Sequence, residues 1–282
     1  MRKEIKKIVR DIENKSGRTL QNKELISNYI FEAMSEGKPV TFFNWECPPR
    51  RIGSTDGKFF IDYNVDLGKI FQGKKTDEYT ELPRVVERSE EEIEMLSFMR
   101  SLGFTFRFVK IVADTNAFYI TPESLSVSGR RTLRNKFREF KNFIKNETLV
   151  YPVKTEAVLF TDLIRQFVGV YEKIYKKSYR LLNVEPTSLL PLAIFREQLT
   201  RTEKHIGIKN GKWVRDFSIR TIATYAAEGV VFEKLSKTVG FSNCIWLNNH
   251  EIDKRTVEVT NCYRRKIGIG DLPMVLWGAG TP

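Results

Sequence analysis

Residues 204–235 read KHIGIKNGKWVRDFSIRTIATYAAEGVVFEKL, and their pattern governs the architecture that we expect for the whole chain. Their apolar and β-branched residues predict strands over 204–208, 212–223 and 227–235. Asn210 and Gly211 stand between the first two, and an Asn-Gly pair between apolar runs is a strong signal for a tight hairpin. Since hairpin strands are antiparallel, this stretch predicts an antiparallel pair of strands.

Further elements of both kinds are expected on either side. Helical periodicity and capping residues predict helices over 2–14, 20–36, 89–102, 128–146, 157–178 and 188–201. Alternating or β-rich runs predict strands over 40–43, 58–63, 104–112, 117–120, 149–154 and 255–262. Residues 241–252 are ambiguous. Helices and strands mixed throughout favour an α/β or α+β sheet protein over a helical bundle.

The composition indicates a folded, basic protein with a polyanionic partner. The chain has 282 residues, 47 Lys and Arg against 35 Asp and Glu, and a net charge of +12. A hydrophobic fraction of 41% excludes a disordered chain. The surplus of positive charge points to nucleic acid, although an anionic membrane surface would satisfy the same charge.

Cysteine and histidine content makes disulfide and metal sites unexpected. The chain has three cysteines, without a CxxC pair, and two histidines. His205 and His250 with a nearby carboxylate would make a facial iron site, but nothing in their spacing requires one, and no metal is expected. The N-terminal residues lack the apolar run of a signal peptide or anchor, so we expect a cytoplasmic protein.

The helix expected over 128–146 carries the densest positive charge. Its apolar stripe is Leu133, Phe137, Phe140 and Ile144. The basic residues left on the wet side are Arg130, Arg131, Arg134, Arg138, Lys141 and Lys145. Such a face would bind phosphates of tRNA or DNA in a salt-dependent way, without reading bases. The alternative is a solvated face that serves only solubility.

The segment Arg264-Arg265-Lys266-Ile267-Gly268-Ile269-Gly270 has the spacing Arg-x-x-Gly-x-Gly after the last expected strand. It resembles the loop with which acetyltransferases of the GNAT superfamily hold the pyrophosphate of coenzyme A on backbone N–H groups. That resemblance implies a cofactor-binding role for Arg264, Arg265, Gly268 and Gly270. The alternative is a glycine-rich turn that closes a sheet.

Residues 116–282 show a more extensive resemblance, to the GNAT-type C-terminal domain of phosphatidylglycerol lysyltransferases and to FemAB-like peptidyltransferases. Four landmarks follow the order of that family: Phe118 to Leu125 with Ser128-Gly129-Arg130-Arg131; Tyr151-Pro152-Val153 with Phe167 and Tyr171; Val230 to Lys234 with Asn248; and Asn261 with Gly268. The segment 263–266 is basic here, whereas the family has acidic residues, and this departure suits an anionic donor or acceptor.

The resemblance implies tandem GNAT-like halves, 1–115 and 116–282, around a mixed, mostly antiparallel central sheet. It also implies acyl or aminoacyl transfer. The implied donor is acyl-CoA or aminoacyl-tRNA. With the positive charge, this favours a transferase that acts on or with nucleic acid, modification of a DNA or RNA base being one such reaction. Two other functions stay open: a non-catalytic nucleic-acid-binding protein that keeps the GNAT-like fold, and an enzyme that acts on lipid.

Acyl transfer to an amine needs a base and an acid, and three residues are candidates. Glu233 and Glu228 flank an expected central strand, where burial would raise the pKa of a carboxyl group as a base requires. Tyr263 stands where GNAT enzymes often have a tyrosine acid. The structural alternatives are an ion pair for Glu233 and an ordinary strand residue for Tyr263.

The stretch Asn44-Trp45-Glu46-Cys47-Pro48-Pro49-Arg50-Arg51 is the most unusual in the first half. Cys47 is a candidate nucleophile whose pKa Arg50 and Arg51 would lower. An exposed Trp45 beside two arginines would equally stack on a nucleic-acid base. The alternative is a Pro-Pro turn with a buried cysteine.

Overall fold

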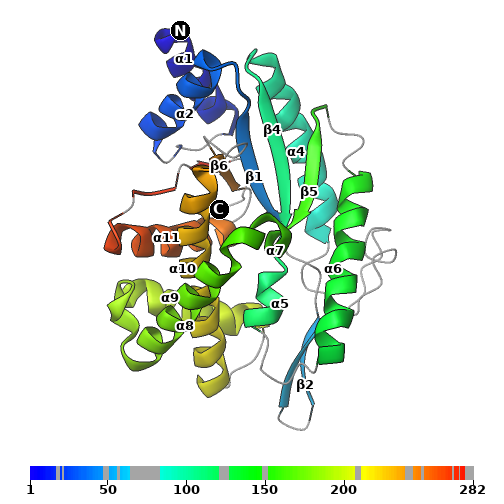
Figure 1. The fold of residues 1–282 in the computed structure, drawn as a ribbon, viewed down its shortest axis with the longest axis vertical. Helices are drawn as coiled ribbons and strands as arrows, with labels where there is room; N and C mark the ends of the chain where they lie inside the picture. The colour runs from blue at the N-terminus through cyan, green and yellow to red at the C-terminus, as the bar shows by residue number, and fades with distance from the viewer. Residues whose placement is uncertain are drawn as a thin grey trace.

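The protein is an α/β structure in which helices cover both faces of one sheet (Figure 1). The fold is taken from a computed structural model. It describes residues 1–16, 20, 22–46, 51–55, 58–63, 83–120, 127–147, 152–206, 211–238, 244–248, 251–268, 270–272 and 274–276.

The sheet has five strands, and every neighbouring pair in it is parallel. The strands are β1 (Val40–Glu46), β4 (Phe106–Val112), β5 (Thr155–Leu159), β6 (Cys244–Asn248) and β7 (Met274–Leu276). Their order is β5-β4-β1-β6-β7. The chain thus starts in the middle, builds outward to one side, and returns to β1 to build the other side, as in doubly wound nucleotide-binding folds.

The expected mostly antiparallel sheet of tandem GNAT-like halves is therefore wrong. Among the described strands, only β2 (Arg51–Thr55) and β3 (Lys58–Asp62) pair antiparallel, and they form a separate hairpin. Strands from both sides of residue 115 share the main sheet, since β4 and β5 are hydrogen-bonded neighbours. The parallel pairing follows from the helices between successive strands of the sheet, which return the chain to the same edge each time.

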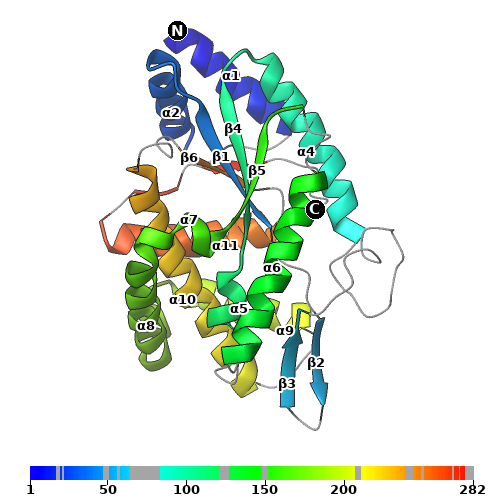
Figure 2. The ribbon, with the colours of Figure 1, turned by 45° about the vertical axis from the view of Figure 1, so that its right-hand side comes forward.

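Adjacent residues of each strand face opposite layers. Phe42 packs with α1 (Arg2–Ser16), α2 (Lys23–Ser35) and α4 (Pro83–Ser101), whereas Phe43 packs with α8 (Val168–Val184), α10 (Gly211–Ser236) and α11 (Glu251–Lys266). Val112 faces α6 (Val127–Glu147) on the layer of α4, while its neighbour Ile111 faces the layer of α10. The two layers are separated in Figure 2.

The strands expected over 212–235 are wrong, because these residues form the single helix α10. Gly211, expected in a hairpin, is the first residue of this helix. Its buried residues lie on nearly every side, including Val214, Ile219, Ala223 and Val231. A helix that is buried all round loses the 3.6-residue pattern of polar and apolar positions, so the sequence looks like buried strands.

Two other expected strands are helical. Residues 255–262 belong to α11, although Val257 and Val259 alternate as in a strand. Residues 117–120 fall mostly in α5 (Thr115–Tyr119), the short helix directly after β4. In both places tertiary packing overrides a β-propensity that spans only about 1 kcal/mol.

Most of the first half follows the expectation. The helices expected over 2–14, 20–36, 89–102 and 128–146 correspond to α1, α2, α4 and α6. The strands expected over 40–43, 58–63 and 104–112 correspond to β1, β3 and β4. The helix expected over 188–201 corresponds to α9 (Leu192–Ile206). The helix expected over 157–178 is wrong in its first part, because residues 157–159 belong to β5 and α8 begins only at Val168.

Helices α10 and α11 approach closely at Gly229. A Cβ atom at this position would lie 2.6 Å from Cγ2 of Thr260 and 3.4 Å from Cγ of Arg264. The hydroxyl of Thr260 donates to the carbonyl of Tyr225 at 3.2 Å, which fixes the methyl group against Gly229.

We expect Gly229→Ala to destabilise the fold, because overpacking of this kind costs about 1–3 kcal/mol. Better helix propensity offsets about 1 kcal/mol of that cost. Thr260→Ser removes the clashing methyl group and keeps the hydroxyl, so the double variant should be at least as stable as the wild type. Urea denaturation of the two single variants and the double variant measures this. If Gly229→Ala lowered the free energy of unfolding equally in the presence and in the absence of Thr260→Ser, the packing explanation would be contradicted.

Candidate active site

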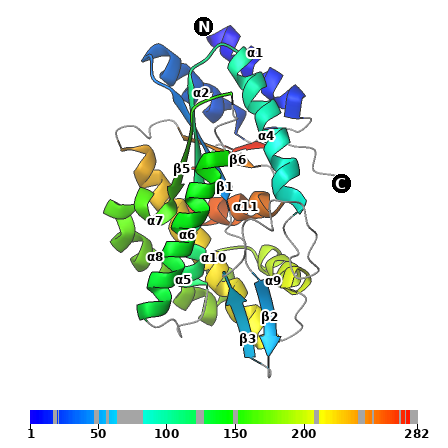
Figure 3. The same ribbon diagram turned by 90° about the vertical axis from the view of Figure 1, so that its right-hand side faces the viewer.

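The carboxyl ends of the strands in this topology converge on one edge. The order reverses between β1 and β6, and doubly wound sheets bind ligands outside the carboxyl ends at such a reversal. Viewed from the side, α1 and α2 lie at one edge of the sheet, whereas α5 and the lower half of α10 lie beyond the other (Figure 3).

Two buried polar residues follow β4 at this edge. Asp114 accepts hydrogen bonds from the backbone N–H of Thr161 at 3.0 Å and from its hydroxyl. Burial raises the pKa of Asp114 to about 6, although the two bonds from Thr161 work against that rise. Thr115 opens α5 and is fully buried. Asp114 and Thr115 are therefore held in fixed positions at the carboxyl edge of the sheet.

Glu228 lies next to Thr115 without a positive partner among the described residues. It is 1% exposed, and Oε1 accepts a hydrogen bond from the Thr115 hydroxyl at 3.4 Å. Among the described residues, neither its Oε2 atom nor the hydroxyl of the buried Tyr171 has a hydrogen bond of normal geometry, although the Thr115 and Thr224 side chains lie close enough to that hydroxyl to lower its pKa. Burial raises the pKa of Glu228 well above the ordinary carboxyl value. Burial likewise raises the pKa of Tyr171, and the charge of Glu228 adds to the rise.

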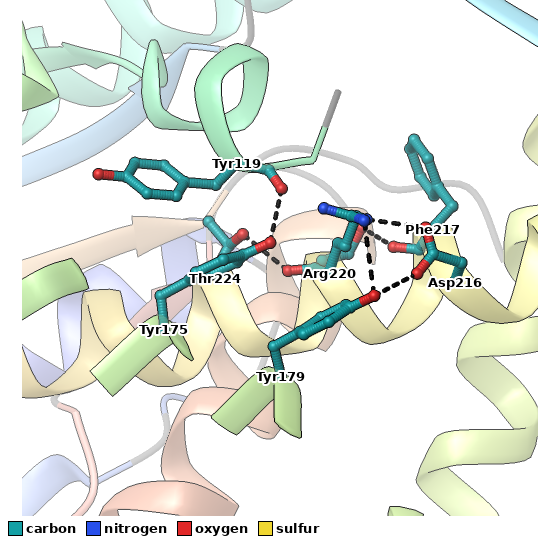
Figure 4. A network of polar contacts seen from close by, with 8 residues as sticks. Tyr119, Tyr175, Tyr179, Asp216, Phe217, Arg220 and Thr224 are labelled. Atoms are coloured by element: carbon teal, nitrogen blue, oxygen red, sulfur yellow. Dashed lines mark hydrogen bonds and ion pairs between the residues drawn. The ribbon is translucent and has the colours of Figure 1, made fainter. Parts of the chain in front are cut away.

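A polar seam runs outward from this pair between α8 and α10, and Figure 4 shows its outer part. The seam consists of Tyr171, Tyr175 and Tyr179 on α8, and of Asp216, Arg220, Thr224 and Glu228 on α10. Both sets repeat every four residues, so each lines one helix face.

The outer part of the seam is fully bonded. Tyr179 donates to Oδ1 of Asp216 and Arg220 donates to Oδ2, both at 2.7 Å. Tyr175 donates to the backbone carbonyl of Tyr119 at 2.7 Å, and burial raises its pKa to about 12. The two unpartnered groups lie at the inner end of the seam, where it meets the sheet.

A second polar cluster lies on the other face of the sheet. Lys110 of β4 pairs with Glu92 at 2.6 Å and with Glu46 at 3.0 Å, and Asn44 donates to Glu92. Lys110 and Glu92 are nearly inaccessible. Since Glu46 is the last residue of β1, the cluster reaches the carboxyl edge from the layer of α4.

Glu233, the other carboxylate candidate, lies on a different side of α10. Its carboxylate pairs with Lys237 at 2.7 Å and Arg264 at 3.2 Å. Burial alone would raise the pKa of Glu233, but the bond from Lys237 and the charge of Arg264 outweigh burial and leave it below the ordinary value. A small pocket lies beside it, lined by Tyr29, Phe43, Phe232, Glu233, Cys244, Trp246, Arg264 and Leu272. The structure does not bring Glu228 and Glu233 together.

The Arg-x-x-Gly-x-Gly segment forms the end of α11 rather than a loop after a strand. Gly268 has φ +78°, and its N–H donates to the carbonyl of Arg265 at 3.1 Å, as at many helix ends. Arg264 is 5% exposed and donates to the carbonyls of Gly270 at 2.7 Å and Gly229 at 3.0 Å. Arg265 pairs with Asp271. These bonds occupy both arginines within the protein.

The remaining candidates from the sequence lie in the core or, in part, outside the described residues. Trp45 is 5% exposed and packs against Phe160, Phe232 and Trp246, so it is not the exposed stacking surface that we expected. Tyr263 is buried in the same core, where burial raises its pKa. Cys47 and Arg50 lie outside the described residues, and of Arg51 only its place at the start of β2 is described.

Helix α6 presents the basic face that its sequence predicts. Phe137, Phe140 and Ile144 are buried against β4 and β5. The exposed positions are Arg130, Arg131, Arg134 and Arg138, while Lys141 is half-buried. The guanidinium of Arg134 lies 5.6 Å from the ring centre of Phe118 in α5. The helix thus adjoins the short helix that begins with Thr115.

No group of three or more His, Cys, Asp or Glu side chains among the described residues has a metal-binding arrangement. No helix within the described ranges is long and apolar enough to cross a membrane.

Comparison with known proteins gives distant structural likeness only. No family model and no curated protein sequence matches the chain. Leishmania major tyrosyl-tRNA synthetase, solved with tyrosinol, is 11% identical over 97% of this chain and 30% of that chain, with a TM-score of 0.49. Tryptophanyl-tRNA synthetase from Trypanosoma brucei is 13% identical over 96% of this chain and 67% of that chain, with a TM-score of 0.39.

The chain therefore spans less than a third of the first of these synthetases. Both structures are aminoacyl-tRNA synthetases, not GNAT acyltransferases. The parallel sheet overturns the resemblance to phosphatidylglycerol lysyltransferases and FemAB-like peptidyltransferases.

The sequence analysis missed Thr115, Tyr171 and the Lys110 cluster as site residues. A detectable signal existed for two of them. Asp114 and Thr115 come directly after a strongly apolar strand, and Lys110 interrupts that strand. Nothing in the sequence pairs Tyr171 with Glu228, because 57 positions separate them and only the packing of α8 on α10 joins them.

Proposed function

We propose that this protein is an aminoacyltransferase that takes its aminoacyl group from tRNA. The observation that carries the proposal is the unpartnered buried pair, Glu228 Oε2 and Tyr171 Oη, at the carboxyl edge of a doubly wound sheet. A buried polar atom without a partner costs about 1–3 kcal/mol. A ligand that supplies the missing partner accounts for its presence.

The chemistry of the pair suits an amine. A carboxyl group and two hydroxyls, those of Tyr171 and Thr115, offer oxygen atoms to N–H donors. In a desolvated site the neutral forms are favoured, so Glu228 is held as a carboxyl group and the amine that binds beside it is neutral, with a free lone pair.

The step that we infer is attack of this amine on the carbonyl carbon of the aminoacyl ester. The new C–N bond forms as the bond from the carbonyl carbon to the ribose oxygen breaks. Glu228 gives its carboxyl proton to the ribose oxygen that leaves. The resulting carboxylate then takes a proton from the attacking nitrogen, so the product is a neutral amide and Glu228 is a carboxyl group again. General acid–base help of this kind accelerates reactions by about 10²–10⁴-fold.

The basic face of α6 favours tRNA over acyl-CoA as the donor. Arg130 to Lys141 span about 16 Å of helix, which exceeds one pyrophosphate and suits a polyanion. The segment expected to hold coenzyme A is a helix end whose arginines bond within the protein. Phosphates along α6 would place the end of a nucleic acid near α5 and Thr115.

Neutralising α6 tests the nucleic-acid part. In a variant with Gln at Arg130, Arg131, Arg134 and Arg138, we expect the plot of log affinity against log salt for unfractionated tRNA to become shallower by roughly 3. Filter binding over a series of KCl concentrations measures this. The matched control places Gln at Lys3, Lys6, Lys7 and Arg10 of α1, which are also exposed.

An unchanged affinity and salt dependence in the α6 variant would contradict the proposal. Transfer is measured separately, as loss of labelled amino acid from charged tRNA in the presence of amines, with products identified by mass spectrometry. Tight, salt-dependent tRNA binding without any product would favour the alternative, a nucleic-acid-binding protein without activity.

A further inference from the structure

The outer face of α8 carries a basic stripe made of Lys173, Lys176, Lys177 and Arg180. All four side chains are exposed, whereas Tyr171, Tyr175, Ser178 and Leu182 face the core. Spacings of three, four and seven residues place the four cations on one side of the helix. We call this set the α8 stripe.

The α8 stripe is not neutralised within the described part of the protein. None of its four side chains forms an ion pair with a carboxylate there. The neighbouring Glu172 accepts a hydrogen bond from Tyr119 at 3.2 Å instead. Like charges three or four residues apart destabilise a helix by about 0.2–0.5 kcal/mol per pair. Helix stability therefore does not explain the stripe, and an anionic partner does.

Helix α5 lies between α6, which bears the basic face, and α8, whose outer side bears the α8 stripe. Phe118 packs on Phe137 of α6, with ring centres 6.1 Å apart. The next residue, Tyr119, packs on Tyr171 and Tyr175 of α8, at 5.0 and 4.9 Å. Figures 1 and 2 both show α5 between α6 and α8. Helices α6 and α8 thus lie on either side of α5 and of the edge where Glu228 and Tyr171 lie, with the α8 stripe on the side of α8 that faces away from α5.

We propose that the α8 stripe is a second phosphate-binding surface for the RNA that lies along α6. This inference rests on the proposed function. Helices α6 and α8 cover opposite faces of the sheet, because Val112 packs toward α6 and Ile111 toward the layer of α8. A flat membrane does not meet two opposite faces at once. A folded RNA backbone meets both when it passes across α5, with its aminoacyl end at Glu228.

The test compares two quadruple Gln variants, one at Lys173, Lys176, Lys177 and Arg180, the other at Lys3, Lys6, Lys7 and Arg10. The α1 set has the same spacing and charge, and α1 lies at the opposite edge of the sheet (Figure 3). With unfractionated tRNA, we expect the α8 variant to lose at least about tenfold in affinity at 150 mM KCl and its salt slope to fall by roughly 3. The α1 variant should keep the wild-type slope.

A second measurement uses the unaltered protein. Brief acetylation of lysines, followed by mass spectrometry, reports which amines tRNA covers. We expect tRNA to slow acetylation of Lys173, Lys176 and Lys177 severalfold, while Lys3, Lys6 and Lys7 react at the same rate with and without tRNA. Circular dichroism of the α8 variant checks that the helix is intact.

The outcomes separate this inference from the proposed function. If the α6 variant loses affinity and the α8 variant does not, the α8 stripe is no RNA surface, and the proposed function stands. Equal losses in the α8 and α1 variants would reduce the effect to net charge and overturn the inference. If the α8 variant lost binding to phosphatidylglycerol vesicles but kept its tRNA binding, the inference would be overturned too. If the wild type binds no tRNA, the proposed function itself fails.

Discussion

Replacement of Glu228 by Gln should reduce aminoacyl transfer by roughly a hundredfold or more and leave tRNA affinity unchanged. The variant keeps the size of the side chain and its hydrogen bond with Thr115. It removes the only group of the pair that takes a proton from an amine. Single-turnover loss of label from charged tRNA, run beside filter binding, separates the two effects.

The same substitution should make the protein more stable than the wild type, by an amount that grows as the pH rises. Because burial raises the pKa of Glu228, the folded protein holds a proton that the unfolded chain releases above the ordinary carboxyl pKa. Wild-type stability is thus lost as the pH rises from that ordinary value toward the folded one. Glutamine has no such loss, so the stability difference should grow by up to about 1.4 kcal/mol per pH unit.

Glu233→Gln is the matched control, and its stability should depend on pH in the opposite sense. Arg264 and Lys237 hold the pKa of Glu233 below the ordinary value, so wild-type stability from this group is present above the ordinary carboxyl pKa and lost at lower pH. We expect this variant to be less stable than the wild type at neutral pH and to keep most of its transfer activity. If Glu233→Gln abolished transfer while Glu228→Gln did not, the catalytic carboxylate would be Glu233.

Replacement of Arg264 by Met should destabilise the fold by about 3–5 kcal/mol. Arg264 is buried and holds the carbonyls of Gly229 and Gly270 and the carboxylate of Glu233. Without the guanidinium these acceptors lose their donor, and the end of α11 loses its connection to α10. Guanidinium chloride denaturation of the variant gives the free energy of unfolding.

Arg265→Met is the control at the neighbouring position. Its ion pair with Asp271 is at the surface, the arginine side chain being 63% exposed, so the cost should be at most about 1 kcal/mol. Equal stabilities of the two variants would show that Arg264 is not a structural residue. Loss of affinity for coenzyme A in Arg264→Met, without loss of stability, would revive the cofactor role predicted from the sequence.

The sequence predicted the elements of the first half better than their assembly. Strands such as 104–112 alternate or are uniformly apolar, and helices such as 89–102 have clear caps, so local rules suffice there. Helix α10 failed these rules because it is buried on nearly every side, and it takes the place of the two strands expected over 212–223 and 227–235. The antiparallel pairing expected for the sheet depended in part on that stretch.

The candidate site was predictable only in its parts. The basic face of α6 follows from helical periodicity, because its apolar stripe is complete. Glu228 drew attention as a carboxylate in an apolar run. Its neighbours did not, since Thr115, Tyr171 and Glu228 come from three separate elements that meet only when α8 and α10 pack beneath β4.

The central place of β1 has a consequence for synthesis of the chain. One of its edges pairs with β4, about 65 residues later, but the other waits for β6, about 200 residues later. Until the ribosome has released residues 244–248, the backbone N–H and C=O groups along that second edge have no strand to bond. Such an open edge attracts other strands. We therefore expect chaperones to bind chains that stall in this interval. Late contacts of this kind also slow folding.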